Sequence, residues 1–307
     1  MQTLKFGGYQ APASIHNRAA ERFGAALQAR MGGEVAFELI GNVLDLGRKS
    51  GELPEMVESG ELDFCYISTV RFSRPVSELK LLELPFVVKD RPTIIRALDG
   101  KLGALLERRM LENTPFRALG FWDNGFRHIS SVRPIRRPED CRGMTIRTQI
   151  SDLHVECFRM LGFEPLPVDI KVFVEEIATG KYQAQDNPLT NTYNFGVHRY
   201  QPHITLTGHL WGASAFICKQ AAYDRWPGKL QDAVRAAARE ATAYQHELAA
   251  AEDGEIMAKL DPREVEVIEL TADERAAFVA AVQPLLAKYR KTLGSELFAY
   301  VDDGSPG

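Results

Sequence analysis

The chain has 307 residues, which is enough for two ordinary domains or one large one. Hydrophobic residues make up 45% of it and charged residues 25%, a globular composition that excludes a disordered or fibrous chain. The formal net charge of -4 excludes the strongly basic field of a nucleic-acid-binding or membrane-surface protein, so no nucleic-acid partner is expected. If the ligand is an anion, local cations must attract it.

The first 70 residues are predicted to alternate strands and helices. The expected elements are a strand Thr3–Gly7, a helix from about Ser14 to Met31, a strand Val35–Ile40, a helix near Leu53–Ser59 and a strand Leu62–Ile67. Apolar residues recur at four-residue spacing along the first helix, and two glycines follow it. This order predicts a largely parallel sheet with helices on both faces.

The rest of the chain repeats this alternation. Strands are expected at Phe116–Phe121, Met144–Arg147 and His203–Thr207. The segment 230–260 is strongly helical and would be about 45 Å long at 1.5 Å per residue, which is longer than one small domain is wide. A capping-box pattern predicts a final helix from Thr271 through Tyr289. Because no linker separates two halves, we expect two α/β lobes joined by several chain crossings, with a cleft at the hinge.

The cysteines and the apolar segments bear on whether the chain holds a zinc site, spans a membrane or is exported. Cys65, Cys141, Cys157 and Cys218 lack the spacing of a zinc site, so isolated buried thiols are expected and a disulfide is left open. No window approaches the roughly 18 to 20 apolar residues that span a bilayer. No signal peptide is visible before the strand-like run Leu4–Phe6, which by itself favours the cytoplasm, although a trimmed exported chain would begin in the same way.

Enzyme signatures are largely absent. The chain contains no GxSxG elbow, phosphate-binding loop, GxGxxG or HExxH motif, and His246-Glu247 lacks the second histidine of the last. Carboxylates and histidines are plentiful, so a catalytic pair assembled by the fold stays open as an alternative. We expect no enzyme activity, no metal and no cofactor, and keep an α/β enzyme acting on an organic acid as the less favoured alternative.

Three segments indicate a binding site instead. The segment FWDNGFRHISSVRPIRRPEDCRGMTIR ends both of its strand-like parts in arginine, at Arg127 and Arg147. Asn187 lies in an Asn-Pro dipeptide, and HITLTGHLW is expected to end a strand with His209 and Trp211. A planar guanidinium matches both oxygens of a carboxylate, and each charge-assisted hydrogen bond contributes about 1.5 to 3 kcal/mol. The alternative is that the arginines are surface cations or partners of acidic residues within a lobe.

Together these segments resemble the solute-binding proteins of tripartite ATP-independent periplasmic (TRAP) transporters, of the dicarboxylate-binding type. The resemblance covers nearly the whole chain and begins with LKFGGYQ. The matching segments follow in the family's order: SGELDFCYIST, ELPFVVKD, FWDNGFRHISS, RPIRRPEDCRGMTIR, QDNPL and YQPHITLTGH. The resemblance implies two α/β lobes, a long helix spanning both, and closure around one ligand. We expect a first lobe of residues 1–124 plus about 212–252, a second of 125–211 plus about 253–307, and the cleft between them.

The resemblance also implies roles for individual residues. Arg147 matches the arginine that pairs with the ligand carboxylate, Asn187 the asparagine that supports it, and Arg127 a second, less uniformly used cation. Tyr9, Ser68 and His209 match positions that line the cleft in relatives.

Trp211 joins the predicted site because it lies close to His209 in the sequence. Three departures from the family bear on the pocket beyond the carboxylate: Gln183 replaces an acid, Ile170 stands where an aromatic residue often covers the ligand, and the loop GNVLDLGRKSGELPEM differs. Tyr9, Trp211 and the apolar Ile170 favour a hydroxylated, branched or aromatic monocarboxylate, with a sugar acid left open.

The resemblance finally implies a bacterial, periplasmic binding protein whose export signal has been removed. Its expected partner is a TRAP membrane permease that uses an ion gradient, and the chain is expected to be a monomer. A ligand sensor or a binding protein of another transport class remains the principal alternative, since it relies on the same closure around a ligand. A neighbouring pair of permease genes, one short and one long, would distinguish the two.

Overall fold

The computed structural model describes residues 1–302, which form a single nine-stranded sheet with helices on both sides. The strand order is β2-β1-β3-β8-β4-β7-β5-β6, and β9 pairs with β8. The strands are β1 (Gln2–Gly7), β2 (Val35–Ile40), β3 (Phe64–Ser68), β4 (Phe116–Ser131), β5 (Thr145–Thr148), β6 (Glu164–Pro167), β7 (Ala184–Pro188), β8 (His203–Lys219) and β9 (Glu266–Ile268).

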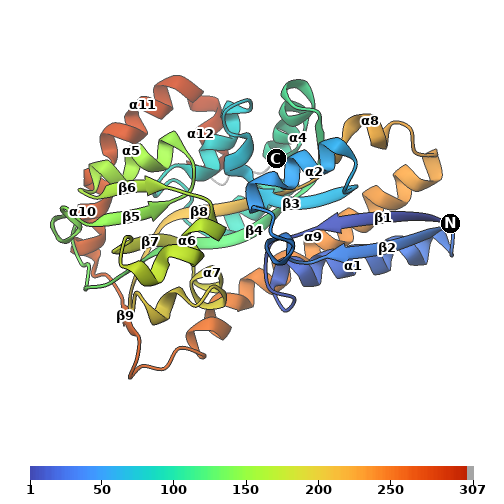
Figure 1. Ribbon diagram of the computed structural model, residues 1–307. Coiled ribbons are helices and arrows are strands. Elements are labelled where there is room, and N and C mark those ends of the chain that lie inside the picture. Colours follow the sequence, from blue (N-terminus) through green and yellow to red (C-terminus); the bar gives the residue numbers. More distant parts are fainter. Residues whose placement is uncertain (303–307) are drawn as a thin grey trace.

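The helices gather around the two ends of this sheet (Figure 1). They are α1 (Ile15–Met31), α2 (Leu53–Ser59), α3 (Arg91–Asp99), α4 (Lys101–Asn113), α5 (Asp152–Met160), α6 (Ile170–Glu176), α7 (Leu189–Asn194), α8 (Gln220–Tyr223), α9 (Gly228–Met257), α10 (Ala272–Ala281), α11 (Gln283–Leu293) and α12 (Ser295–Asp302). At one end β1 pairs in parallel with β2 and β3, and at the other β5 pairs in parallel with β6 and β7. This confirms the predicted α/β class with two parallel groups of strands.

The first helix forms where the sequence predicts it. The Ser14 hydroxyl accepts a hydrogen bond from the backbone N–H of Asn17 at 3.2 Å, which satisfies one free donor of the first turn. Gly32 ends the helix in the left-handed conformation, with φ of 59°. The capping box of Thr271 and Glu274 is also present at the start of α10.

Two strands are much longer than predicted. The expected strands at 116–121 and 203–207 continue as β4 and β8, which run antiparallel to each other and join the two ends of the sheet. Glycines and polar residues along them resemble strand ends in the sequence. The sheet accommodates them with register shifts, one of which lies between Asp123 and Gly125, where Gly125 has φ of 86°.

The long helix α9 is present as predicted and lies along both parts of the molecule (Figure 1). Its 30 residues correspond to about 45 Å. It packs on α1, β4 and α7, and Glu240 bridges Arg22 at 2.7 Å and Arg30 at 2.9 Å on α1. The predicted final helix is instead divided into α10 and α11, because Pro284 in the first turn of α11 has no backbone N–H to continue the ladder. The last helix, α12, packs on α3.

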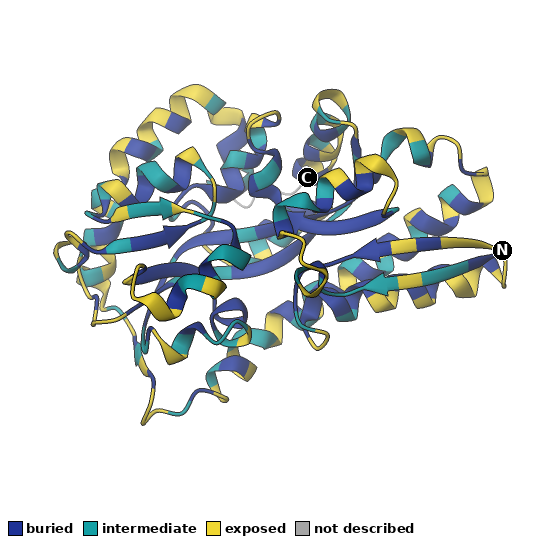
Figure 2. Cartoon of the chain, in the orientation of Figure 1, coloured by how far each residue is buried: buried dark blue, intermediate teal, exposed yellow. Residues whose placement is uncertain are grey.

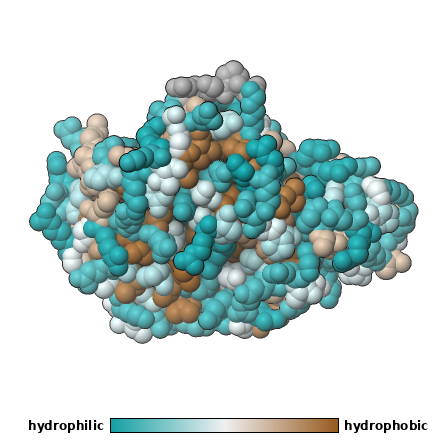
Figure 3. Space-filling model, turned by 90° about the horizontal axis from the view of Figure 1, so that it is seen from above, coloured by the Kyte–Doolittle hydropathy of each residue, from teal (hydrophilic) through white to brown (hydrophobic). Residues whose placement is uncertain are grey.

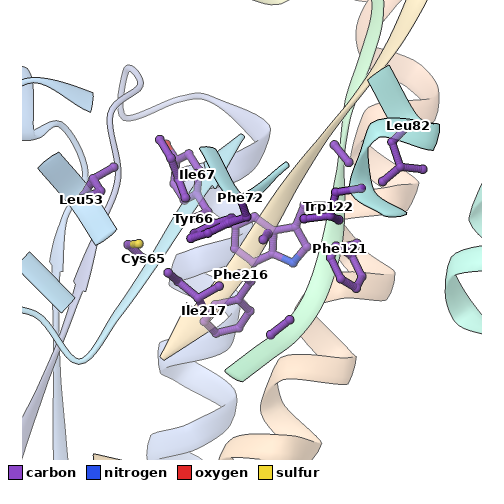
Figure 4. Packing of buried hydrophobic residues seen from close by; sticks show 14 of the residues in the cluster. Leu53, Cys65, Tyr66, Ile67, Phe72, Leu82, Phe121, Trp122, Phe216 and Ile217 are labelled. Atoms are coloured by element: carbon purple, nitrogen blue, oxygen red, sulfur yellow. The ribbon is translucent and has the colours of Figure 1, made fainter. Parts of the chain in front are cut away.

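Aromatic side chains form the centre of the core under β1, β3 and β8. The Phe216 ring lies 5.1 Å from Phe6, 4.9 Å from Phe23 and 5.2 Å from Trp122 between ring centroids. Figure 4 shows Phe216 and Trp122 packed beside Tyr66. Figure 2 shows buried residues along the central strands and exposed ones on the outer helix faces. This packing holds the strands that support the site rigidly.

The cysteines, the helices and the surface show the features of a globular protein. All four cysteines are buried and free, which confirms the expectation of isolated thiols. None of the helices described is both long and apolar enough to cross a membrane. On the face in Figure 3, hydrophobic residues form separate clusters among hydrophilic ones.

Candidate functional site

A narrow pocket, partly open to solvent, lies between the two parts of the molecule. Its lining comes from loops and strand ends of both parts: Tyr9, Ser50, Ile67, Ser68, Val70, Arg71, Arg147, Gln149, Ile150, Val168, Ile170, Asn187 and Asn191. Four predicted site residues, Tyr9, Ser68, Arg147 and Asn187, therefore lie together in one pocket.

Arg147 is a buried cation in the wall of this pocket. It lies on β5, and its side chain is 3% exposed. The guanidinium donates from Nε and Nη2 to the Val168 carbonyl oxygen, at 3.2 and 2.9 Å, and lies 5.5 Å from the Phe173 ring centre. Within residues 1–302 it forms no ion pair with a carboxylate, and burial lowers its pKa to about 10. A guanidinium has five N–H donors, so several remain for an anion in the pocket.

Asn187 lies on β7, next to β5 in the sheet, and its side chain is also buried. Its amide donates to the Gln185 side chain, and its carbonyl oxygen accepts from Arg127 at 3.3 Å. An amide carries two N–H groups, so one can bond Gln185 and the other can donate elsewhere. Arg127 thus holds the Asn187 carbonyl oxygen in place.

Arg127 is already paired within the protein. Its Nε donates to the Asp186 carboxylate, and its Nη2 donates to the Asp186 backbone carbonyl. Burial opposes ionisation of Asp186, but the charge and the hydrogen bonds of Arg127 outweigh it and hold the pKa of that carboxyl far below its ordinary value. Arg127 is therefore an arginine paired with an acidic residue, which is the alternative that the sequence left open. It also lines a second cavity beside the main pocket.

Three predicted site residues lie within strands and not at strand ends. Arg127 is on β4, and His209 and Trp211 are on β8, because both strands continue through the junction between the two parts. The strand-end prediction was therefore wrong for these residues. His209 lies behind the pocket, with Nδ1 at 2.7 Å from the Thr207 hydroxyl and Nε2 at 3.7 Å from the Asp186 carboxylate. Trp211 lines the second cavity.

An ion pair across the mouth of the pocket was not predicted. The Asp169 carboxylate accepts hydrogen bonds from the Ser50 hydroxyl at 2.9 Å, the Gly51 backbone N–H at 3.2 Å and the Arg71 guanidinium at 2.9 Å. Burial opposes ionisation of Asp169, but a bond from the Lys171 N–H and these partners leave its pKa below the ordinary value. These bonds join segments about 100 residues apart. The position of Arg71, just after β3, was the available signal in the sequence.

The predicted departures from the family have different positions. Ile170 lines the pocket at the start of α6, and the loop that differs from the family contributes Ser50. Gln183 is exposed, and its side chain accepts a hydrogen bond from the Thr145 backbone N–H at 3.1 Å. The expectation that Gln183 shapes the pocket was therefore wrong, because its side chain supports the start of β5 instead.

The donor set of the pocket suits an organic anion better than a metal ion. Its charged lining residues, Arg71 and Arg147, are cations, and Asp169 is already paired with Arg71. No group of three or more histidine, cysteine or carboxylate side chains in the described chain has the arrangement of a metal site.

Comparison with known proteins identifies the family over nearly the whole chain. Residues 6–292 match the family model described as bacterial extracellular solute-binding protein, family 7. The 2,3-diketo-L-gulonate-binding periplasmic protein of Escherichia coli is 29% identical, over 92% of this chain and 84% of its own length. The C4-dicarboxylate-binding periplasmic protein of Rhodobacter capsulatus is 27% identical, over 97% of this chain and 89% of its own length.

A solved structure agrees with these sequences. The TRAP periplasmic solute-binding protein of Sulfurospirillum deleyianum, with bound succinate, matches with a TM-score of 0.92 and 26% identity, over 99% of this chain and 100% of the other. The family consists of binding proteins of transporters and not of enzymes. The chain therefore belongs to the bacterial extracellular solute-binding proteins of family 7, the binding proteins of TRAP transporters.

Proposed function

We propose that this protein captures a small organic carboxylate in the periplasm, with the Arg147 guanidinium as the anchor of the carboxylate. The observation that carries the proposal is a guanidinium only 3% exposed, in the wall of a pocket, with no acidic partner among residues 1–302. A buried charge without a counter-ion is costly, so an anionic ligand that supplies one gains affinity from the pairing. Asn187, in the same wall, supports the carboxylate through its amide.

Closure of two lobes around the ligand is the second part of the proposal. Asp169, in the predicted second lobe, bonds Ser50 and Arg71, in the predicted first lobe. The Gln10 amide donates to the Asn191 side chain at 3.3 Å across the same boundary. Such contacts exist only when the lobes meet. The ligand can shift the equilibrium toward this state only if it binds the closed form better than the open one.

Delivery to a TRAP permease completes the proposed function. The relatives named above bind a sugar acid or C4-dicarboxylates, and this supports a small acid as the cargo of this chain. Family membership supports a membrane permease as the partner and an ion gradient as the energy source.

The direct test is calorimetric titration of the Arg147→Ala variant with an acid found by a thermal-shift screen. A ligand at about 100 times its dissociation constant adds about 2.7 kcal/mol to the free energy of unfolding, which is visible as a higher melting temperature. Arg147→Ala is expected to abolish binding while the circular dichroism spectrum is unchanged. Arg142→Ala, which removes an exposed arginine of the same segment, is the matched control. Unchanged affinity in folded Arg147→Ala contradicts the proposal.

A further inference from the structure

A second cavity, with room for about one water-sized group, adjoins the main pocket and is lined by side chains that the proposed function does not use. The two cavities share Ser68, Val70 and Gln149 in their linings. The Gln149 amide donates to the Ser68 hydroxyl at 3.5 Å, a long bond that joins the two sides of the shared wall. The two cavities are therefore neighbours, and the Gln149–Ser68 bond is part of the wall that they share.

Three side chains in the second cavity have buried polar atoms without partners in the described chain. These are both carboxyl oxygens of Glu83, both ring nitrogens of His154 and the indole nitrogen of Trp211. The side chains are 4%, 1% and 2% exposed, respectively. Buried polar atoms are nearly always hydrogen-bonded, and leaving one without a partner costs roughly 1 to 3 kcal/mol. Five such atoms around one cavity indicate that a polar group occupies it.

The two halves of the cavity come from different lobes. Glu83 ends the 3-10 helix Ser77–Glu83 in the predicted first lobe, and His154 lies on α5 in the predicted second lobe. Their closest atoms, Oε2 and Nε2, are 3.8 Å apart, which is too long for a direct hydrogen bond. A hydroxyl or carbonyl oxygen placed between them could bond both. The cavity is thus completed by closure, as expected of a ligand subsite.

The charges around the two cavities sum to a single positive charge. Arg71 is balanced by Asp169, and Arg127 by Asp186, so both pairs are neutral. Arg147 has no such partner among residues 1–302.

Glu83 and His154 add nothing to this sum. Burial raises the pKa of Glu83 to about 8 and lowers that of His154 to about 3, so both are neutral near pH 7. If the proton passed from Glu83 to His154, the pair would still carry no net charge. The pockets therefore balance one anionic charge on the ligand, and a second carboxylate in the cavity would be uncompensated.

We propose that the cavity lined by Glu83, His154 and Trp211 binds an uncharged hydroxyl or carbonyl group at the end of the ligand far from its carboxylate. The ligand is then a monocarboxylate with a polar, neutral tail and not a dicarboxylate. This inference rests on the proposed function, because Arg147 must hold the carboxylate at the other end. Glu83, His154 and Trp211 are the specificity-determining residues.

The test uses ligand-free, full-length protein and matched acids of about four to six carbons. For each chain length, the ω-hydroxy monocarboxylate is compared with the plain alkanoate and the α,ω-dicarboxylate by calorimetry. At the chain length that fits, the hydroxy acid is expected to bind about 10-fold more tightly than either. Glu83→Ala and Trp211→Phe are expected to reduce this advantage to less than about 3-fold, because they weaken binding of the hydroxy acid more than binding of the alkanoate.

Two further variants separate the subsite from a general effect on folding. Glu83→Gln retains hydrogen-bonding groups and is expected to keep most of the preference for the hydroxy acid. Glu156→Gln, on the same helix as His154 but paired with Lys288 outside the cavity, is expected to bind like the unmodified protein.

Several outcomes would overturn the inference. In the unmodified protein, these are equal affinities for the hydroxy acid and the alkanoate, tighter binding of the dicarboxylate, or no binding of any acid in the set. In Glu83→Ala, it is a loss of affinity that is equal for all the acids. Failure of the proposed function is recognised separately, because the alkanoate would then bind equally well to the unmodified protein and to Arg147→Ala.

Discussion

The Arg147 guanidinium and the Val168 carbonyl oxygen are joined by two hydrogen bonds, at 3.2 and 2.9 Å. Val168 lies between β6 and α6, so a backbone carbonyl fixes the plane of the guanidinium without neutralising its charge. The side chain is oriented toward a pocket before any ligand arrives, which reduces the entropy lost on binding.

Replacement of this guanidinium by a lysine ammonium tests the importance of that plane. Arg147→Lys keeps the charge but lacks the planar fork of donors that bonds Val168 on one side and can meet both carboxylate oxygens on the other. The affinity for the acid is expected to fall by about 10- to 100-fold, the loss of one to two charge-assisted hydrogen bonds. Calorimetry measures the change, with Arg142→Lys as the exposed control. A loss smaller than about 3-fold would show that charge alone holds the ligand.

Asp169 is expected to stabilise the closed state. Asp169→Ala removes the bonds from Ser50, Gly51 and Arg71 across the pocket mouth. The variant should therefore populate a more open form, with a larger radius of gyration in small-angle scattering and weaker ligand binding, by about 10-fold. The matched control is Asp152→Ala, because Asp152 meets Arg74 at 3.7 Å but is 98% exposed, and such pairs contribute little. Equal scattering from both variants would contradict this role.

The buried pair of Arg127 and Asp186 is expected to support the fold more than the affinity. Asp186→Ala leaves the Arg127 charge buried and unpaired, so the free energy of unfolding should fall by about 3 to 5 kcal/mol in urea denaturation at pH 7. Asp302→Ala breaks the more exposed pair with Arg290 and should cost about 1 kcal/mol or less. A similar small loss for both variants would argue against a buried ion pair.

The contribution of Asp186 to the free energy of unfolding also depends on pH. Its pKa in the folded chain is far below the ordinary 3.8, so the unfolded chain binds more protons at acid pH. The stabilisation is therefore complete above about pH 4 and decreases as the pH falls further. The difference in free energy of unfolding between the unmodified protein and Asp186→Ala, measured by urea denaturation, should therefore decrease as the pH falls below about 4.

Glu83 should make the ligand-free protein less stable as the pH rises. Burial raises its pKa from the ordinary 4.5 to about 8, so between these pH values Glu83 keeps its proton in the folded chain and loses it in the unfolded chain. The free energy of unfolding therefore decreases as the pH rises toward 8. Between about pH 6.5 and 8, where unfolded histidines are mainly neutral, Glu83 should lower the free energy of unfolding by up to about 1.4 kcal/mol per pH unit.

Glu83→Gln isolates this effect from that of Glu252, whose pKa is raised by burial to about 7. The Gln variant cannot ionise, so its stability should change less over the same pH range and exceed that of the unmodified protein at pH 8. Urea denaturation at several pH values measures both. Parallel pH profiles for the two proteins would show that Glu83 is ionised in the folded chain.

Much of the local structure was predictable because it depends on neighbouring residues. Ser14 caps α1, Gly32 ends it, and the apolar repeat of the 230–260 segment forms α9. The break at Pro284 was also visible in the sequence, but the helical pattern on either side obscured it. The lengths of β4 and β8 were not predictable, because antiparallel pairing along both lobes overrides the local glycines.

The sequence by itself determined the alternation of strands and helices, the family, and the cation at Arg147, because these are properties of segments and of their order. Only the tertiary structure decided which charges meet. It paired Arg127 with Asp186, 59 residues away, and placed Asp169 against Arg71, 98 residues away. It also gathered Glu83, His154 and Trp211 around one cavity. Burial and distance determine whether a charge is neutralised or left for a ligand, and both arise only when distant segments pack together.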